Sequence, residues 1–391
     1  MRVKRAAALP VAMVAGLIGL TGCAAAAPGV PAPTRSAEVS TPATPALDTA
    51  AWVDERLSGM TLEQKAASLL MLHAPGTDAA PLRALVDRGI AGVILMGDNI
   101  PAGPEELGAL TGALQVDDEA ATLIGIDEEG GIVQRLDWDT AAGPEALRAA
   151  PPAAAHDAFA ARGDVLAASG VNVNFGIVAD VTADPDSFIF DRVLGGDAKS
   201  AADRVAAAVA GEQGRVASTV KHFPGHGAAP GDSHRSVPSA PLSMDEWRTT
   251  AEPPFAAAID AGADLVMTGH LAYPAVDAAP ASLSPEWHRI LREELGFDGV
   301  IVTDDMLMLQ HNELPEYADP GENAVRAVAA GSDLLLYVLP ADPSEFGISV
   351  DGLAGSIADA VRSGRIPEER LDDAASRVLE LRRQIFLDHG E

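Results

Sequence analysis

Residues 221–234 hold a dense group of ionisable side chains, namely Lys221, His222, His226, Asp232 and His234. Asp232 and His234 are two residues apart, so in an extended backbone both side chains would point the same way. A carboxylate beside an imidazole stabilises the imidazolium and orients the ring, as a proton donor or acceptor near neutral pH requires. Glycines and a proline keep this segment out of regular structure. We therefore predict a catalytic acid–base pair on a mobile loop.

Short aliphatic or β-branched segments alternate with alanine-rich amphipathic segments from Trp52 onward, which is typical of a parallel sheet covered by helices. The expected strands are residues 68–72, 92–96, 122–126, 171–175, 218–220, 264–267, 299–302 and 333–338. The expected helices include residues 61–70, 105–114, 198–213, 244–261, 285–295, 322–330 and 368–386. This pattern predicts an α/β fold, a single-domain (β/α)8 TIM barrel. The rival architecture is a doubly wound open sheet. The sequence has no glycine-rich nucleotide loop after the first strand to support it.

Polar and ionisable residues come just after four of the expected strands. They are Asp127, Lys221 with His222, His270, and Asp304 with Asp305. In a barrel, the carboxyl ends of the strands converge on one mouth, where the active sites of this fold lie. Because buried charged groups are costly unless they are paired or used, packing does not explain this arrangement. The sequence therefore predicts an active site at the C-terminal mouth.

Three segments resemble motifs of glycoside hydrolase family 3, in the β-N-acetylglucosaminidase branch that includes peptidoglycan-recycling enzymes. Besides residues 221–234, these are Gly-Ile-Asp-Glu-Glu-Gly-Gly-Ile-Val-Gln-Arg-Leu at 125–136 and Gly-Phe-Asp-Gly-Val-Ile-Val-Thr-Asp-Asp-Met-Leu-Met at 296–308. The resemblance extends from about residue 52 to residue 383. It implies a retaining exo-β-N-acetylglucosaminidase (a β-hexosaminidase) that needs no cofactor. Its substrate would be a cell-wall glycan or muropeptide, such as GlcNAc-MurNAc, with terminal N-acetylglucosamine (GlcNAc).

The resemblance also assigns roles to individual residues. Asp304 matches the catalytic nucleophile, His234 matches the acid/base, and Asp232 matches its partner. The positions that match sugar-binding residues are Asp127, Arg135, Arg192, Lys221 and His222. Two departures concern the far end of the substrate site: Ile132 stands where the family often has arginine, and the segment around Arg192 is a poor copy of the usual pattern.

These roles also agree with elementary chemistry. A retaining glycosidase needs a carboxylate that attacks the anomeric carbon and a group that protonates the leaving oxygen and later deprotonates water. A neutral histidine is not repelled by an anionic nucleophile as a second carboxylate would be. We expect Asp305 to be a helix N-terminal residue and His270 to line the pocket. Glu128 and Glu129 are expected to be supporting hydrogen-bond partners.

The N-terminus predicts export. Residues 1–5 are basic and residues 6–20 are apolar, which suits a signal peptide but is shorter than the ~20 residues of a membrane span. Residues 20–23, Leu-Thr-Gly-Cys, resemble a bacterial lipobox that would lipidate Cys23, the only cysteine; the alternative is an ordinary signal peptide with a chance cysteine. We expect residues 1–22 to be a lipoprotein signal peptide, 23–50 the lipid-attachment cysteine and a flexible linker, and 51–391 the barrel. The protein would be a monomer, lipid-anchored on the extracytoplasmic face of the cell membrane.

The net charge of −30, from 57 acidic and 27 basic residues, argues against a nucleic-acid partner. Two other functions stay open. One is a metal-dependent barrel hydrolase, with ligands among His222, His226, Asp232, His234 and His270. The other is a non-catalytic sugar-binding lipoprotein. The first lacks a His-x-His motif after the first strand, and the second would have no need of a nucleophile and an acid/base. We therefore expect no metal.

Overall fold

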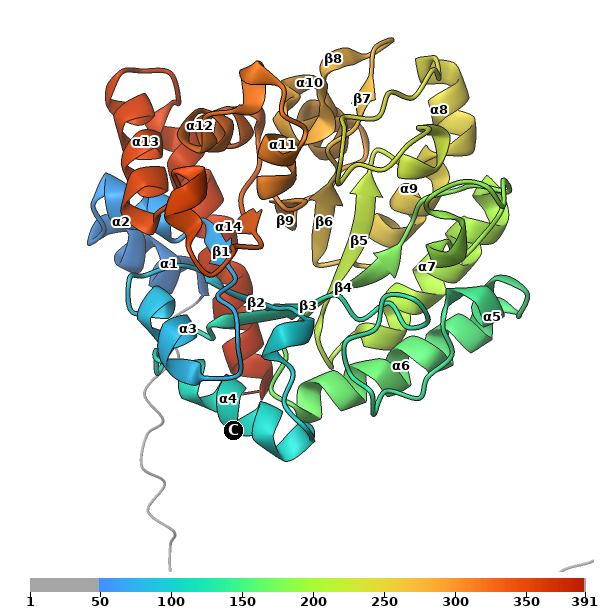
Figure 1. Cartoon of the computed structure of the whole chain (residues 1–391), viewed down its shortest axis with the longest axis horizontal. Helices are drawn as coiled ribbons and strands as arrows, with labels where there is room; N and C mark the ends of the chain where they lie inside the picture. Colours follow the sequence, from blue (N-terminus) through green and yellow to red (C-terminus); the bar gives the residue numbers. More distant parts are fainter. Residues whose placement is uncertain (1–48, 390–391) are drawn as a thin grey trace, which may run out of the picture. The chain divides into compact units, whose positions relative to one another are not determined.

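Eight parallel strands curl into a barrel that is surrounded by helices (Figure 1). The computed structural model describes residues 49–389. Cys23, the expected signal peptide and nearly all of the expected linker lie outside the described residues. The first helix, α1, begins at Thr49, inside the range 23–50 that was expected to be linker.

The barrel strands follow the order β10-β1-β2-β3-β4-β5-β6-β9. Their bounds are β1 Leu70–Leu72, β2 Gly92–Leu95, β3 Leu123–Ile126, β4 Val173–Val178, β5 Ala217–Phe223, β6 Leu265–Thr268, β9 Val300–Thr303 and β10 Leu335–Tyr337. A parallel bridge between Val302 and Leu334 joins the last two strands, where the Thr303 N–H donates to the Leu334 carbonyl at 3.0 Å. The prediction of a (β/α)8 TIM barrel is confirmed.

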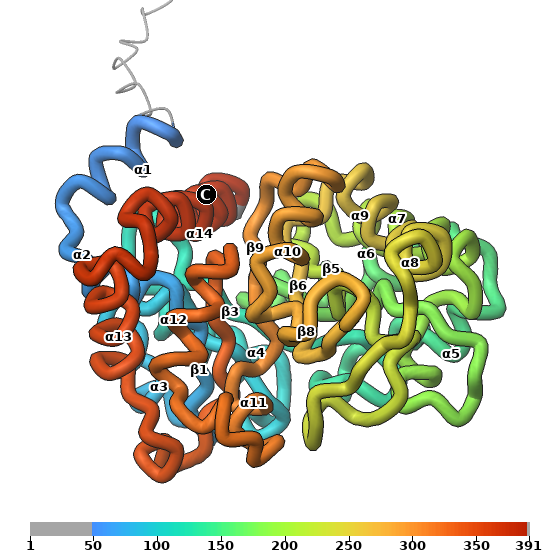
Figure 2. The backbone as a smooth tube through the Cα atoms, turned by 90° about the horizontal axis from the view of Figure 1, so that it is seen from above, coloured from blue at the N-terminus to red at the C-terminus, as the bar shows by residue number. Residues whose placement is uncertain are grey.

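The helices cover the outside of the barrel (Figure 1). Their bounds are α1 Thr49–Ser58, α2 Leu62–Ala67, α3 Ala79–Val86, α4 Pro104–Leu114, α5 Pro144–Arg148, α6 Pro152–Ala168, α7 Ala198–Glu212, α8 Met244–Thr250, α9 Glu252–Asp260, α10 Pro285–Arg289, α11 Leu307–His311, α12 Pro320–Ala330, α13 Val350–Arg362 and α14 Glu368–His389. Seen from above, α1 runs beside α14, and Trp52, Val53 and Leu379 are buried together there (Figure 2). The first and last helices thus pack against each other.

Local sequence signals explain several helix boundaries. Thr61 and Ser243 each form a capping box, with Gln64 and Glu246 respectively, which satisfies backbone N–H groups at the helix start. The single helix expected over residues 244–261 is instead two helices, α8 and α9. The prolines in the first turn of α9 have no N–H to donate to the preceding turn, so the helix breaks there.

The strands carry the site residues differently from what was expected in two places. β4 ends at Val178 rather than at residue 175, and β5 continues to Phe223 rather than ending at residue 220. Lys221 and His222 therefore lie within β5 and not after it. A short antiparallel hairpin, β7 Ala272–Tyr273 with β8 Asp277–Pro280, was not expected and follows β6.

All eight barrel strands are buried along their whole length, as in parallel sheets covered on both faces. Within residues 49–389, none of the helices has both the length and the apolar character needed to span a bilayer.

Candidate active site

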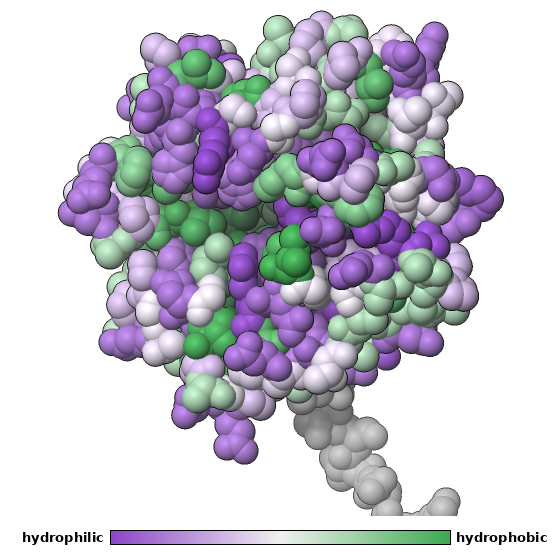
Figure 3. Space-filling model, turned by 45° about the vertical axis from the view of Figure 1, so that its right-hand side comes forward, coloured by the Kyte–Doolittle hydropathy of each residue, from purple (hydrophilic) through white to green (hydrophobic). Residues whose placement is uncertain are grey.

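A cavity of about 460 Å³ opens at the carboxyl ends of the barrel strands. The predicted residues that line it are Asp127, Arg135, Arg192, Lys221, His222, His234 and Asp304. Asp232 adjoins the cavity through its contact with His234. A space-filling view shows a hollowed face on which hydrophobic and hydrophilic side chains adjoin (Figure 3). The structure thus brings all the described candidate residues to one mouth.

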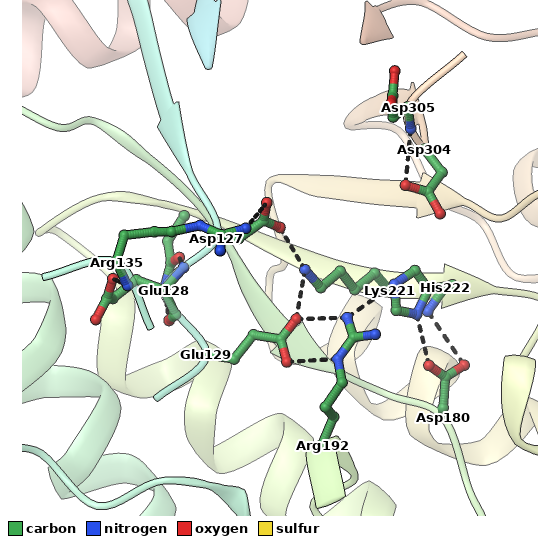
Figure 4. Close-up of polar contacts among 11 residues, drawn as sticks. Asp127, Glu128, Glu129, Arg135, Asp180, Arg192, Lys221, His222, Asp304 and Asp305 are labelled. Atoms are coloured by element: carbon green, nitrogen blue, oxygen red, sulfur yellow. Dashed lines mark hydrogen bonds and ion pairs between the residues drawn. The ribbon is translucent and has the colours of Figure 1, made fainter. Parts of the chain in front are cut away.

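Lys221 forms the centre of a buried ion cluster. Its Nζ lies 2.7 Å from Asp127 Oδ1 and 2.7 Å from Glu129 Oε1 (Figure 4). Burial would raise the pKa of Asp127, but Lys221 and Arg135 outweigh it and lower that pKa to about 2. Burial would likewise lower the pKa of Lys221, but the two carboxylates outweigh it and raise that pKa. Burial would raise the pKa of Glu129 as well, but Lys221 and Arg192 outweigh it and lower that pKa. Asp127, Glu129 and Lys221 are therefore charged at neutral pH.

Arg192 extends this cluster. Its guanidinium donates two hydrogen bonds to Glu129, from Nε to Oε2 at 2.9 Å and from Nη2 to Oε1 at 2.7 Å (Figure 4). The same Nη2 lies 3.4 Å from His222 Nε2. Although the segment around Arg192 departs from the family pattern, the structure places this residue in the cavity wall. Glu129 is fully buried and contacts both Arg192 and Lys221, as expected of a supporting hydrogen-bond partner.

Asp180 is a site residue that the sequence patterns did not indicate. His222 Nδ1 lies 2.7 Å from Asp180 Oδ2, so Nδ1 carries a hydrogen that it donates to this carboxylate. Burial would raise the pKa of Asp180, but His222 outweighs burial and lowers it. Because β4 continues to Val178 rather than ending at residue 175, Asp180 follows the strand end by only two residues and lies at the mouth.

The loop after β3 folds back on itself to present Arg135. Gly130 and Gly131 have φ of 80° and 69°, a left-handed conformation that glycine adopts without steric cost. Glu128 Oε2 accepts the Arg135 N–H at 2.8 Å, and Arg135 Nη2 reaches Asp127 Oδ2 at 3.4 Å. Glu128 therefore supports the loop as predicted, and burial raises its pKa to about 7.

Asp304 and Asp305 follow β9 and have different environments. The Asp304 carboxylate lines the cavity and accepts the Asp305 N–H at 2.8 Å. Burial would raise the pKa of Asp304, but His222 and the hydrogen bond from the Asp305 N–H outweigh it and lower that pKa. The Asp305 carboxylate accepts the N–H groups of Leu307 and Val338, and burial raises its pKa to about 7. Asp304 is thus the ionised carboxylate. Asp305 lies just before α11, as expected of a residue at the N-terminus of a helix, and binds the N–H of Leu307, the first residue of that helix.

Asp232 and His234 are in contact, but not through an extended strand. Residues 233–235 form a turn, and Asp232 Oδ1 accepts both the His234 N–H at 3.0 Å and a ring contact from Nδ1 at 2.7 Å. The tight turn, rather than two-residue alternation, brings the side chains together. The His234 side chain is 58% exposed, so its Nε2 is open to a ligand.

The remaining histidines differ from expectation. His270 does not line the cavity; it is buried behind the turn that carries Asp304 and Asp305, against Ser282 and the Asp305 carbonyl. His226 and His311, which were given no individual role, do line the cavity. Among the described residues, His226 Nε2 has no hydrogen-bond partner, and burial lowers the pKa of this ring.

The rim of the cavity carries two exposed apolar side chains. Ile132 is 67% exposed and Phe188 is 38% exposed, and both line the cavity. The Phe188 ring centre lies 5.8 Å from that of His234 and 5.4 Å from that of His226. The departure at Ile132 therefore places an apolar group, not a cation, at the outer end of the site.

Across residues 49–389, no three histidine, cysteine or acidic side chains are grouped so that they could hold a metal ion. Three of the four histidines proposed as metal ligands have other ring partners: Asp180 for His222, Asp232 for His234, and Ser282 for His270. The geometry therefore gives the metal-dependent alternative no support.

The cavity combines an ionised carboxylate, an imidazole with an open Nε2, and charged groups that can bind hydroxyls. These are the groups that a retaining glycoside hydrolase needs. The model of the Glycosyl hydrolase family 3 N terminal domain matches residues 61–381. The chain belongs to glycoside hydrolase family 3.

Several relatives are similar over most of the chain. A beta-hexosaminidase of Methylobacillus flagellatus is 31% identical, covering 68% of this chain and 79% of its own length. One of Pseudomonas aeruginosa is 35% identical, covering 68% and 80%. A solved family 3 β-N-acetylglucosaminidase of Paenibacillus sp. has a TM-score of 0.76 at 36% identity, covering 84% of this chain and 63% of that one, so the chain spans less than two thirds of that enzyme. The β-N-acetylhexosaminidase of Beutenbergia cavernae has a TM-score of 0.72 at 31% identity, covering 82% and 98%.

Proposed function

We propose that the protein is a retaining exo-β-N-acetylglucosaminidase that removes terminal GlcNAc from peptidoglycan fragments such as GlcNAc-MurNAc. The observation that supports this most directly is that Asp304 and His234 line the same cavity as the charged cluster around Lys221. Its volume of about 460 Å³ lies within the ~300–1,000 Å³ of small-molecule sites. The relatives named beta-hexosaminidase support the same sugar specificity.

In the first step, an Asp304 oxygen attacks the anomeric carbon while His234 Nε2–H protonates the glycosidic oxygen. The carbon–oxygen bond to the leaving sugar breaks, a covalent glycosyl-enzyme forms on Asp304, and His234 becomes neutral. Asp232 holds His234 Nδ1–H, so the proton is transferred at Nε2.

In the second step, neutral His234 removes a proton from water, and the resulting hydroxide displaces Asp304 from the sugar. GlcNAc leaves with its original anomeric configuration, and both side chains return to their starting states. Asp127 can accept from sugar hydroxyls, while Arg135 and Lys221 can donate to them.

The test measures hydrolysis of 4-nitrophenyl N-acetyl-β-glucosaminide and of the matching β-glucoside. Each is measured with and without phosphate, and with and without a chelator. We expect hydrolysis of the first substrate, little of the second, and no loss of activity with a chelator. Equal rates on both substrates would contradict the sugar assignment. Loss of activity with the chelator would instead favour the metal-dependent hydrolase. Absence of any turnover would favour the non-catalytic sugar-binding protein.

The peptidoglycan assignment needs its own comparison. Disaccharides of GlcNAc with a MurNAc or a GlcNAc leaving sugar share the bond that is cleaved and differ only in the leaving sugar. Higher kcat/KM on the MurNAc disaccharide would support a cell-wall substrate. Higher kcat/KM on the GlcNAc disaccharide would show that the enzyme acts on another glycan.

We also propose that the protein is exported and anchored through lipid on Cys23. The support is in the sequence: a basic start, an apolar stretch, and a single cysteine after Leu20-Thr-Gly. Cys23→Ala should move activity from the membrane fraction to the soluble fraction without changing kcat. If the variant stays with the membrane, another element holds it there.

A further inference from the structure

His270 is a buried histidine directly behind the nucleophile turn. It follows β6 and is 1% exposed. Its Nδ1 lies 2.6 Å from Ser282 Oγ, and its Nε2 lies 2.9 Å from the backbone carbonyl oxygen of Asp305. Both ring nitrogens therefore have a partner, and one of these partners belongs to the residue after Asp304.

The partners define the tautomer of His270. A carbonyl oxygen can only accept, so Nε2 must carry the hydrogen. Burial lowers the pKa of His270, which makes the ring neutral and leaves Nδ1 without a hydrogen. The Ser282 hydroxyl must then donate to Nδ1. The hydrogen bonds run in one direction, from Ser282 through His270 to the Asp305 carbonyl.

Asp305 is held at both ends of its backbone. Its N–H donates to Asp304 Oδ1 at 2.8 Å, and its carbonyl accepts from His270. The Asp304 carboxylate thus takes its orientation from a peptide group whose residue is fixed from the other side by His270. Loss of the His270 contact would free the Asp305 carbonyl and allow this residue to rotate.

We propose that His270, oriented by Ser282, is a positioning residue that holds the nucleophile turn and thereby the attacking oxygen of Asp304. The inference rests on the proposed role of Asp304 as nucleophile. A displacement of about 1 Å at a reacting atom can cost ~100-fold in rate, so a contact that fixes this turn affects catalysis without touching the substrate.

Two conservative substitutions separate the two ring nitrogens. The amide of glutamine reaches the place of Nε2, whereas the amide of asparagine reaches only the place of Nδ1. His270→Gln should therefore keep the bond to the Asp305 carbonyl, and His270→Asn should lose it. The readouts are kcat, KM, the inactivation rate with a 5-fluoro derivative of GlcNAc carrying an activated leaving group, and the melting temperature. The activated leaving group removes the need for acid catalysis and isolates attack by Asp304.

We expect His270→Gln to stay within about threefold of the wild-type kcat, and His270→Asn to lose at least tenfold in kcat and in inactivation rate with little change in KM. Ser282→Ala should act in the same direction, and the Ser282→Ala/His270→Asn double variant should be no worse than His270→Asn alone, because both residues act through one contact.

His288 supplies the matched control. It is also buried, and its ring contacts the Ser284 carbonyl at 2.8 Å and Ser332 Oγ at 2.9 Å, outside the cavity. Its Gln and Asn variants should lower the melting temperature without changing the inactivation rate. Equal kcat losses for His270→Gln and His270→Asn, or losses that follow the melting temperature, would overturn the positioning role alone. Absence of label on Asp304 in the wild-type enzyme would overturn the nucleophile assignment and this inference together.

Discussion

Asp232 Oδ1 accepts two contacts from His234, one from its backbone N–H at 3.0 Å and one from its ring Nδ1 at 2.7 Å. The turn and the carboxylate therefore fix the ring together, and Nε2 remains open. Burial would raise the pKa of Asp232, but its hydrogen bonds with His234 outweigh burial and lower it, so this group is an anion at neutral pH. An anion on Nδ1 favours the imidazolium that must protonate the leaving oxygen.

The first prediction concerns His234→Ala. A natural disaccharide has a poor leaving group and depends on protonation, so kcat/KM should fall about 10²–10⁴-fold. Nitrophenyl glycosides need little protonation and should lose much less, and azide should partly restore turnover by attacking the glycosyl-enzyme without base help. Equal losses on every leaving group would place the acid/base elsewhere, with Glu128 and Glu129 the first residues to test.

The second prediction concerns Asp232→Asn. The amide keeps the shape of the carboxylate but removes the negative charge that favours the imidazolium. Since the first step needs the protonated ring, the alkaline limb of the kcat/KM profile should move to lower pH. A profile that keeps its position while kcat falls would show that Asp232 only orients the ring.

The strands were predictable because buried parallel strands are nearly continuous aliphatic runs, and all eight expected strands are present. The carboxyl ends of barrel strands converge on one mouth, so Asp127 and Asp304, which follow two of these strands, could be placed there. Strand length was harder to predict. The three further strand residues at the end of β4 place Asp180 beside His222, and no local pattern marks where that strand ends.

Contacts between distant segments could not be read from the sequence. Arg192 and Glu129 are 63 positions apart, and their pairing depends on the packing of a 3-10 turn against the loop after β3. The hairpin β7–β8 is also hidden, because Asp277–Pro280 has neither the aliphatic run nor the alternation typical of a strand. Ser282 lies just after this hairpin, so its contact with His270 could not be predicted from the sequence either.

The third prediction separates the two adjacent aspartates. Asp304→Asn removes the attacking oxygen and should lower kcat on the order of 10⁴-fold, with the fold unchanged by circular dichroism. Asp305→Asn should lose far less, because the wild-type carboxyl has a pKa near 7 and the amide keeps an oxygen for the Leu307 and Val338 N–H groups. A 5-fluoro GlcNAc inactivator should label Asp304; label on Asp127 or either glutamate would contradict the assignment.

The fourth prediction concerns Glu129→Gln. This change leaves buried Lys221 with Asp127 as its remaining ion-pair partner and removes the carboxylate with which buried Arg192 pairs. Breaking a buried pair in this way costs about 3–5 kcal/mol of unfolding free energy. Urea denaturation measures this loss, and KM should rise as the sugar-binding groups shift. The matched control is Glu322→Gln, which breaks the exposed pair with Arg365 and should change stability far less because water screens it. Equal losses in both variants would show that the cluster contributes no more than a surface pair.

The last prediction concerns the pH dependence of stability. Glu212 is fully buried at the end of α7, where Oε1 accepts from Asn174 Nδ2 at 2.5 Å. Burial raises its pKa from 4.5 to about 8, with Asn174 opposing this shift. Between these values the folded protein binds a proton that the unfolded chain releases, so unfolding free energy falls as pH rises, by up to about 1.4 kcal/mol per pH unit.

Glu212→Gln carries no proton to lose and should remove this fall. Urea denaturation at pH 5, 6.5 and 8.5 should show the variant close to the wild type at low pH and increasingly more stable than it toward pH 8.5. The exposed Glu316→Gln serves as control and should follow the wild-type curve. If Glu212→Gln is destabilised by the same amount at every pH, the wild-type group is ionised throughout and its carboxylate, rather than its neutral acid, is what Asn174 binds.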